Sequence, residues 1–502
     1  MSRIVRSQHF MLGLVQQFCV PLSSDSRRRL GKPHSRLVLI LIRLKQVLST
    51  AVTAHAWRRV QGFAASHSRN LIGLFSTSFF LNLTNFGVSG LLIIAIPASL
   101  FASYLVGQSI MLLSACLADG GLATAARIIA SKERPDGLLI TALQRVLNRY
   151  AVMLAGVGFI VIAVIIGALS RFDQAREVHV SSGVLLIFAA IGFVQARQNL
   201  CAGLIYSGGQ FRPYSTAVLL PGVTRMVCLS ALIAMRVNIA LPMLIANDLF
   251  SALVGWFYSS LWLRRLRREV SARGSAGSVP MLGQQVHRML RSGMLPTFLE
   301  AVAVQSPVLA GSAFGSGASV AAFGVFLRAI QVIKIVIDPL ITYAERRVRL
   351  ASAEERRRAE AYFFGFVGGA YILVASGILL VYIAASALFK HYALGHSAEL
   401  AFCLASTLVA FMYVCFDSIL LSRGYAKFRL TGTILQVTAM LLFVTILHPA
   451  SLWQLVLLNG MIAVPRCAFY AWFYLRRRLE RVAWTVWVQE TEEPVLPNER
   501  LR

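Results

Sequence analysis

The sequence predicts an all-α, polytopic integral membrane protein of about 12 transmembrane helices, arranged in two six-helix lobes. Hydrophobic residues make up 57% of the 502 residues and charged residues only 14%, whereas a soluble domain has about 25% charged residues. The apolar residues fall in runs of about 20, the length that a helix needs to cross a bilayer. Basic residues are abundant in every second connecting segment and scarce in the others, the pattern of alternating cytoplasmic and external loops.

The first segment, residues 1–70, is basic and irregular, with twelve Lys and Arg against one acid, Asp25. Its apolar piece 10–22 resembles the core of a signal peptide, but two glutamines interrupt it and no clear cleavage site follows. The piece 37–48 is too short to span and suits an amphipathic helix on the inner leaflet. We expect residues 1–70 to be a cytoplasmic segment that is either disordered or upstream of the true start of translation.

From residue 71 onward the hydropathy becomes regular. Twelve spans are predicted: 72–97, 101–126, 147–169, 182–206, 214–235, 239–262, 294–314, 319–344, 361–388, 398–421, 429–447 and 451–475.

The charges of the connecting segments support this count. The predicted outer segments carry only Arg171, Arg176, Arg236 and Lys390, and all other segments between spans are strongly basic or contain Arg212. A missed helix would invert the alternation from that point onward. We therefore expect a multi-pass membrane protein with both termini in the cytoplasm. The outer segments are too short to hold an external catalytic domain.

The spans divide into an N-terminal lobe, 71–263, and a C-terminal lobe, 294–475, with a cytoplasmic tail at 476–502. The lobes are joined by a basic cytoplasmic bridge, 264–293, whose Gly/Ser run at 274–278 predicts a flexible connector.

A weak sequence similarity between the lobes, which we call the hairpin echo, suggests that they arose by internal duplication. Each lobe enters its fifth span through a hairpin with Ser and Gly followed by Phe-Arg, at Phe211–Arg212 and at Phe428–Arg429. Thr216 and Thr433 follow at the same offset. The alternative is that two ordinary helix turns share common turn residues.

Polar side chains inside spans are costly and therefore indicate function. In the eighth span Arg328, Gln331, Lys334 and Asp338 recur at spacings of three, three and four residues, which places them on one helix face. A cationic face suits an anionic substrate such as a pyrophosphate. Alternatively, Asp338 only neutralises Lys334. Arg225 lies too deep in the fifth span to reach the surface and is expected to face the interior.

Three acids are candidates for coupling to a cation or proton: Glu300, Asp338 and Asp417. Glu300 lies between Pro296 and Pro307, which are expected to bend or break the seventh span. The alternative is a structural carboxylate paired with an arginine of a neighbouring span. Asp119, beside Gly120 and Gly121, is expected to be structural.

The first span contains Asn82 and Asn85. These amides would either bind sugar hydroxyls or bridge helices.

Several classes of function are excluded or unsupported. The net charge of +28 suggests nucleic acid only in a soluble protein, and here the arginines cluster between apolar runs, so no nucleic-acid partner is expected. The cysteines and histidines have no metal-ligand or disulfide spacing. We expect no cofactor and no metal. The basic loops instead predict contact with anionic inner-leaflet lipids.

Two stretches carry a family resemblance. SACLADGGLATAARIIAS in the second span and AAFGVFLRAIQVI in the eighth are similar to motifs of the polysaccharide-biosynthesis flippases, the Wzx-like O-antigen or exopolysaccharide translocases. These belong to the multidrug/oligosaccharidyl-lipid/polysaccharide (MOP) exporter superfamily. The resemblance covers about residues 70–475, and the long basic N-terminus departs from it.

The resemblance implies a MATE-like fold and a transporter of the bacterial inner membrane that flips an undecaprenyl-pyrophosphate-linked oligosaccharide by ion-coupled alternating access. Implied partners are this lipid-linked oligosaccharide, a proton or sodium ion, and other polysaccharide assembly proteins. Arg328 and Arg127 lie at the matching arginines of the two motifs. From its position alone, Arg127 is expected to reach towards the cytoplasm instead.

Three other functions remain open. A MATE-type drug or metabolite exporter would share the fold but would require an acidic cation site in the first half, where only Asp119 and Asp248 lie in or near spans. A membrane enzyme of glycan assembly would need longer outer loops. A scaffold without transport would leave the charges inside the spans as an unexplained cost.

Overall fold

The computed structural model describes residues 77, 79–123, 125–126, 137–171, 178, 180–208, 210–271, 282–350, 353–384, 396–422 and 426–477. All of them belong to one compact unit, Leu74–Arg502. The basic segment 1–70, Arg127, the Gly/Ser run of the bridge and the tail beyond residue 477 lie outside the described residues.

Within this part of the chain every regular element is a helix, and the predicted all-α membrane fold is confirmed. A first helix, Phe79–Ala95, precedes eleven longer ones that are each long and apolar enough to cross a membrane. These are α4 (Ala98–Asp119), α6 (Gly137–Ser170), α7 (Ser182–Ser207), α8 (Phe211–Ala234), α9 (Leu241–Ser271), α10 (Leu282–Phe314), α11 (Gly317–Leu350), α12 (Ala353–Ala384), α13 (Ser397–Ser422), α14 (Ala426–Leu447) and α15 (Leu452–Arg477).

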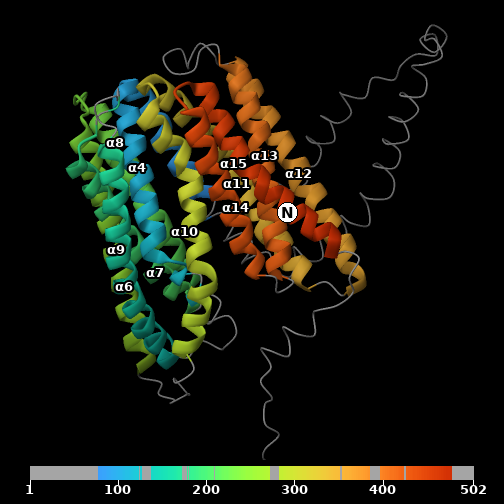
Figure 1. Ribbon diagram of the computed structural model, residues 1–502. Coiled ribbons are helices and arrows are strands. Elements are labelled where there is room, and N and C mark those ends of the chain that lie inside the picture. The colour runs from blue at the N-terminus through green and yellow to red at the C-terminus, as the bar shows by residue number, and fades with distance from the viewer. Residues whose placement is uncertain are drawn as a thin grey trace, which may run out of the picture. The chain divides into compact units, whose positions relative to one another are not determined.

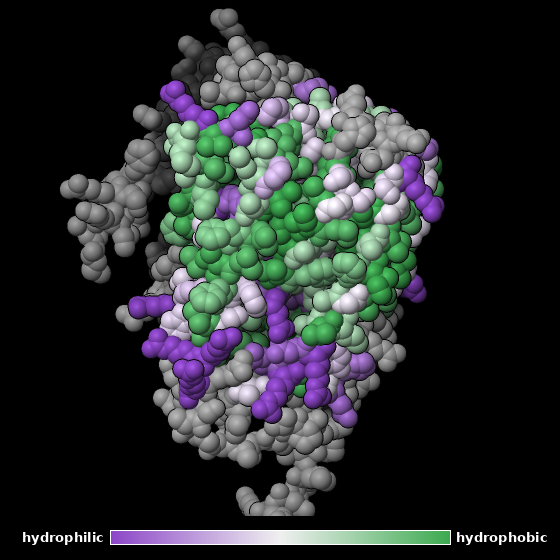
Figure 2. Space-filling view, turned by 90° about the vertical axis from the view of Figure 1, so that its left-hand side faces the viewer, coloured by the Kyte–Doolittle hydropathy of each residue, from purple (hydrophilic) through white to green (hydrophobic). Residues whose placement is uncertain are grey.

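The helices form two bundles (Figure 1). In the N-terminal lobe α4 packs on α7, and α7 and α8 pack on α9; in the C-terminal lobe α15 packs on α13 and α14. The lobes meet where α4 contacts α10 and α11. The surface of the N-terminal lobe carries a hydrophobic band with hydrophilic side chains gathered at one end (Figure 2). We call this the basic end, because α6 begins and α9 finishes there with exposed arginines: Arg145, Arg149, Arg264, Arg265 and Arg268.

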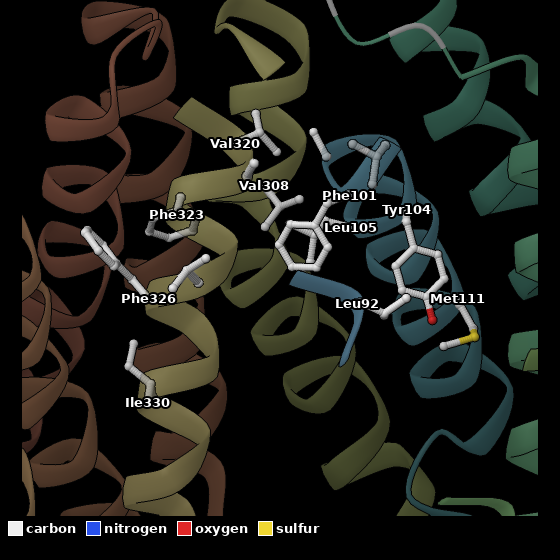
Figure 3. Close-up of a cluster of buried hydrophobic side chains, with 14 of the residues drawn as sticks. Leu92, Phe101, Tyr104, Leu105, Met111, Val308, Val320, Phe323, Phe326 and Ile330 are labelled. Atoms are coloured by element: carbon white, nitrogen blue, oxygen red, sulfur yellow. The ribbon is translucent and has the colours of Figure 1, made fainter. Parts of the chain in front are cut away.

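An apolar cluster joins the lobes away from the basic end. Phe101 and Leu105 of α4 lie beside Val320 and Phe323 of α11, and all four are almost completely buried (Figure 3). Gly324 permits this approach, because a Cβ there would collide with Leu105 Cδ1 and lie 3.1 Å from Phe101 Cε1. The halves of α4 and α11 that lie away from the basic end are therefore closely packed, and we call these the outer halves of the two helices.

Gly120 and Gly121 end α4 in the left-handed region, at φ values of 48° and 85°. The second span is thus interrupted at these glycines, and residues 122–123 and 125–126 are again helical. Glycine suits both positions, since residues with a Cβ rarely adopt this conformation.

The bridge is helical at both of its ends, and its Gly/Ser run, for which a flexible connector is predicted, lies outside the described residues. Helix α9 continues to Ser271 and α10 begins at Leu282, so most of 264–293 is helical. Helix α10 also passes through Pro296 and Pro307 without interruption.

Helix α10 is shared between the lobes. Val286 and Leu290 belong to a buried cluster with Leu143 and Leu263 of the N-terminal lobe. Further along, Ala303 and Ala310 pack with residues of α14 and α15.

The hairpin echo has a structural counterpart. Thr216 Oγ1 donates to the carbonyl oxygen of Arg212 at 3.2 Å, and Thr433 Oγ1 donates to that of Arg429 at 2.8 Å. The two threonines therefore satisfy the same backbone position in the first turns of α8 and α14. Such bonds are common in helices, so they agree with duplication without requiring it.

Candidate functional site

A network of polar side chains crosses from one lobe to the other. We call Tyr104, Gln108, Arg225, Asp248 and Arg328 the interlobe network. Helix α4 supplies Tyr104 and Gln108 one turn apart, and α8, α9 and α11 supply the charged members. Because these residues lie inside apolar spans, each polar side chain requires a partner inside the bundle.

Within the N-terminal lobe, Arg225 and Asp248 form the charged core of this network. Arg225 Nε lies 2.6 Å from Asp248 Oδ1, with the side chains 15% and 2% exposed. Tyr104 accepts a hydrogen bond from Arg225 Nη2 and donates one to Asp248 Oδ2 at 2.9 Å. Asn247 Nδ2 donates to the Arg225 carbonyl oxygen at 3.1 Å. The Asp248 carboxylate therefore has two partners, one on α8 and one on α4.

Arg328 extends the network into the C-terminal lobe. Its Nη2 donates to Gln108 Oε1 at 2.6 Å, and Gln108 Nε2 donates to Tyr104 Oη at 3.0 Å. Arg328 lies eleven residues after Gly317, or about 17 Å along the helix, which is near the middle of a hydrocarbon core about 30 Å thick. Two arginines share one carboxylate, so the network has a formal charge of +1.

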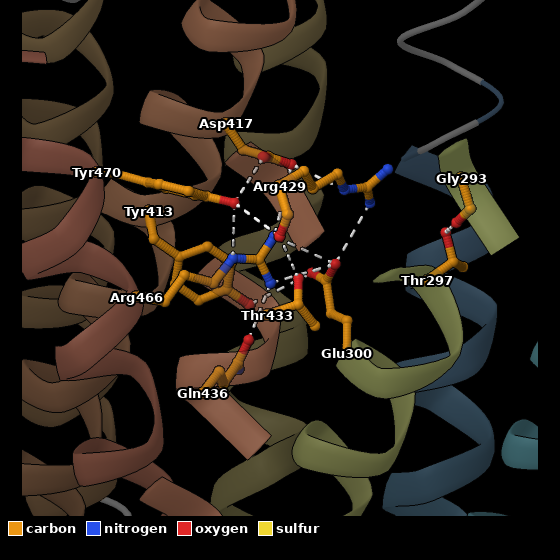
Figure 4. A network of polar contacts seen from close by, with 10 residues as sticks. All are labelled: Gly293, Thr297, Glu300, Tyr413, Asp417, Arg429, Thr433, Gln436, Arg466 and Tyr470. Carbon is orange, nitrogen blue, oxygen red and sulfur yellow. Dashed lines mark hydrogen bonds and ion pairs between the residues drawn. The ribbon is translucent and has the colours of Figure 1, made fainter. Parts of the chain in front are cut away.

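A second network lies wholly in the C-terminal lobe, and we call it the C-lobe network (Figure 4). Its charged members are Glu300, Asp417, Arg429 and Arg466. Glu300 Oε2 is 3.3 Å from both Arg429 Nη2 and Arg466 Nη1. Asp417 Oδ2 is 3.2 Å from Arg429 Nε and 3.5 Å from Arg466 Nη2. Two carboxylates and two guanidinium groups make this network formally neutral.

Arg466 is the centre of the C-lobe network and is 0% exposed. It donates to Gln436 Oε1 at 2.8 Å and lies over the ring of Tyr413, 4.3 Å from its centroid. Tyr470 accepts from Arg466 Nε at 3.3 Å and donates to Asp417 Oδ1 at 3.1 Å. Every face of this guanidinium therefore contacts an acceptor or an aromatic ring, which is what a buried arginine requires.

The predicted site residues are divided among these networks and other places. Arg225 and Arg328 are brought together in the interlobe network, and Glu300 and Asp417 in the C-lobe network. Gln331 is partly buried, and its Oε1 is buried without a hydrogen-bond partner among the described residues.

Lys334 and Asp338 are exposed further along α11 and belong to neither network. Asn82 and Asn85 are partly buried on the first helix. In the part of the chain that the structure describes, neither asparagine side chain has a hydrogen-bond partner.

The sequence did not single out Tyr104, Gln108 and Arg466 as site residues. Arg466, like Arg225, is an isolated arginine inside an apolar run. The criterion that identified Arg225 would therefore have identified Arg466 as well. Tyr104 and Gln108 carry no comparable signal. Among the described residues, no group of three or more His, Cys, Asp or Glu side chains could hold a metal ion.

No protein-family model and no curated protein matches this sequence. Solved structures do match. One is an inward-facing multidrug resistance MATE family transporter of the MOP superfamily (16% identity, TM-score 0.54, covering 80% of this chain and 94% of that chain). Another is the outward-facing conformation of such a transporter (15%, 0.55, 82% and 96%).

A third is a MOP superfamily transporter from Pyrococcus furiosus Vc1, whose binding pocket is described as having reverse polarity that suggests a different function (15%, 0.54, 81% and 95%). At 15–16% identity these matches establish the fold. The chain has the all-helical, two-lobed fold of the MATE transporters of the MOP superfamily.

Proposed function

We propose that the protein flips an undecaprenyl-pyrophosphate-linked oligosaccharide across the bacterial inner membrane, for the synthesis of an exopolysaccharide or O-antigen. The main structural support for this proposal is the interlobe network. It links two arginines and a single carboxylate through Tyr104 and Gln108 near the middle of the membrane, at the junction of the two lobes. An excess positive charge there suits a pyrophosphate, which guanidinium groups bind through paired hydrogen bonds.

Substrate contacts are assigned to residues of α11, α8 and the first helix. Arg328 and Arg225 would bind the pyrophosphate, with Lys334 and Gln331 further along the same helix as Arg328. The buried Gln331 Oε1 has no partner in the described part of the chain, so it is available to a hydroxyl. Asn82 and Asn85 would bind sugar hydroxyls.

Coupling to a proton or sodium ion is assigned to Glu300 and Asp417, with Asp338 as a further candidate. Both carboxylates of the C-lobe network contact the same two arginines. A cation that neutralised one carboxylate would leave the arginines in excess and would weaken the contacts between α10, α13, α14 and α15. This would give the ion a means of changing the packing of the lobe.

The positive-inside pattern orients the basic end towards the cytoplasm and both termini with it. Its exposed arginines would then meet anionic lipids of the inner leaflet. Other polysaccharide assembly proteins are expected partners.

A MATE-type exporter of a drug or metabolite has the same fold and is the second candidate. The +1 charge of the interlobe network disfavours a cationic drug but would accept an anionic metabolite. A membrane enzyme of glycan assembly has less support, because the solved structures that match are transporters.

Deletion of the gene and complementation test the proposal. Without the protein, a lipid-linked oligosaccharide should accumulate on the cytoplasmic leaflet and surface glycan should be lost, and the intact gene should restore both. Unchanged surface glycan without any accumulating intermediate would refute the flippase. Export of an anionic metabolite by the purified protein in liposomes would favour the second candidate.

A further inference from the structure

The N-terminal lobe contains a cavity that the interlobe network does not use. It lies between α4, α6, α7 and α9 and has a volume of about 350 Å³. Apolar side chains, including Val152, Ala155 and Trp256, form most of its wall, and Asp119 and Arg197 contribute the charged groups.

This cavity is reached from the lipid side of the lobe. Val152 is 72% exposed and Trp256 is 39% exposed, and both lie inside apolar spans. Side chains that are exposed at this level of a transmembrane bundle meet hydrocarbon chains unless another helix covers them. The surrounding bilayer can therefore supply an occupant.

Arg197 gives the cavity its specificity. It lies ten residues before Ser207, the last residue of α7, or about 15 Å from the basic end along the helix. No residue that the structure describes accepts a hydrogen bond from its side chain or forms an ion pair with it. Asp119, in the same cavity, accepts a hydrogen bond from the backbone amide of Ala123 at 3.1 Å.

An arginine at this depth is costly unless an anion or a polar group meets it. A guanidinium group binds phosphate through two parallel hydrogen bonds. We propose that the cavity binds one membrane phospholipid, with its phosphate drawn down to Arg197 and an acyl chain against Val152 and Trp256. The site belongs to one lobe and is separate from the cargo path proposed between the lobes, so it stands whatever the cargo is.

Native mass spectrometry of the purified full-length protein tests the site. The unmodified protein should retain one phospholipid. Arg197→Gln should reduce the retained fraction about tenfold, the value of one charge-assisted hydrogen bond. Arg149→Gln, an exposed arginine of α6, is the matched control and should retain the lipid. Ala155→Phe fills the cavity while keeping the charge and should also remove the lipid.

Fluorescence in nanodiscs supplies a second readout. Phosphatidylglycerol with brominated acyl chains should quench Trp256, measured as the difference between the protein and its Trp256→Phe variant, and Ala155→Phe should abolish this quenching. Retention of the lipid by both Arg197→Gln and Ala155→Phe would overturn the site. Displacement of the phospholipid by equimolar polyprenyl phosphate would overturn the choice of occupant, and so would binding of inorganic phosphate with equal affinity.

Discussion

Arg328 of α11 donates a hydrogen bond to Gln108 of α4 at 2.6 Å, and this bond joins the two lobes near the middle of the membrane. The two residues are 220 positions apart in sequence. Any motion that separates α4 from α11 must break this contact, and an anionic cargo would compete with Gln108 for the same guanidinium group.

Replacing Arg328 tests its role as a cargo ligand. Arg328→Ala should abolish complementation of the deletion strain, because the network loses its excess positive charge. Arg328→Lys should restore part of the activity, since it keeps the charge but not the planar fork. By immunoblot, the amount of each Arg328 variant in the membrane should stay within about twofold of that of the unmodified protein. Arg149→Ala is the matched control, and full activity of Arg328→Ala would remove this residue from the site.

Asp248 should be required for stability more than for cargo binding. Asp248→Ala leaves Arg225 buried without its counter-charge, which should cost about 3–5 kcal/mol. Thermal unfolding of the purified protein in detergent measures the loss as a lower midpoint. The double variant Asp248→Ala, Arg225→Leu should recover most of it, because the network then returns to its original formal charge of +1. A double variant as unstable as Asp248→Ala would show that the ion pair is not the cause.

Arg466 should stabilise the C-terminal lobe through its two carboxylates. Arg466→Leu leaves Glu300 and Asp417 with Arg429 as their shared partner and should cost about 3–5 kcal/mol. The control is Arg476→Leu at the exposed end of α15, where the change should fall within about 0.5 kcal/mol. The same thermal unfolding assay applies. Equal midpoints for the two variants would contradict the assigned role of Arg466.

Gly324 should control the closure of the lobes. Gly324→Leu cannot fit against Leu105 and Phe101, so the outer halves of α4 and α11 should separate. Spin labels at Ser99 and Ala318, both exposed near the outer ends of these helices, should then report a larger population at long distances by double electron–electron resonance. Gly365→Leu, on α12 where a Cβ meets no atom within 4 Å, should leave the distribution unchanged. An unchanged distribution in Gly324→Leu would show that this packing does not hold the lobes together.

The sequence predicted the helices well, because apolar length and loop charge report directly on a chain that crosses a membrane. It also identified Arg225, Glu300, Arg328 and Asp417 as charges inside spans, each of which needs partners within the bundle. It did not predict their partners. The pairing of Arg466 with Glu300 joins residues 166 positions apart, and hydropathy carries no information about which spans are neighbours.

Other features of the site and the fold could not be predicted, because they depend on contacts between helices. Tyr104 and Gln108 are ordinary residues for a membrane helix, and they acquire their role only through contact with Arg225, Asp248 and Arg328. Helices α9 and α10 extend into the two ends of the bridge, to Ser271 and from Leu282, which its polar composition did not predict, whereas the flexibility expected of its Gly/Ser run stays a prediction. Apolar positions such as Val286 and Leu290 are buried against the N-terminal lobe, and this packing favours helix over coil.

Because α10 packs against both lobes, it connects them as a helix that must bend when they move, and not as a loose linker. Its first turns are fixed to the N-terminal lobe and its last turns to α14 and α15, so a change in the angle between the lobes must be absorbed inside the helix. Pro296 lies between the two anchored portions and leaves a missing backbone hydrogen bond where bending costs least. Lengthening the connection between Ser271 and Leu282 should therefore leave the mechanics intact, whereas Pro296→Ala should stiffen them.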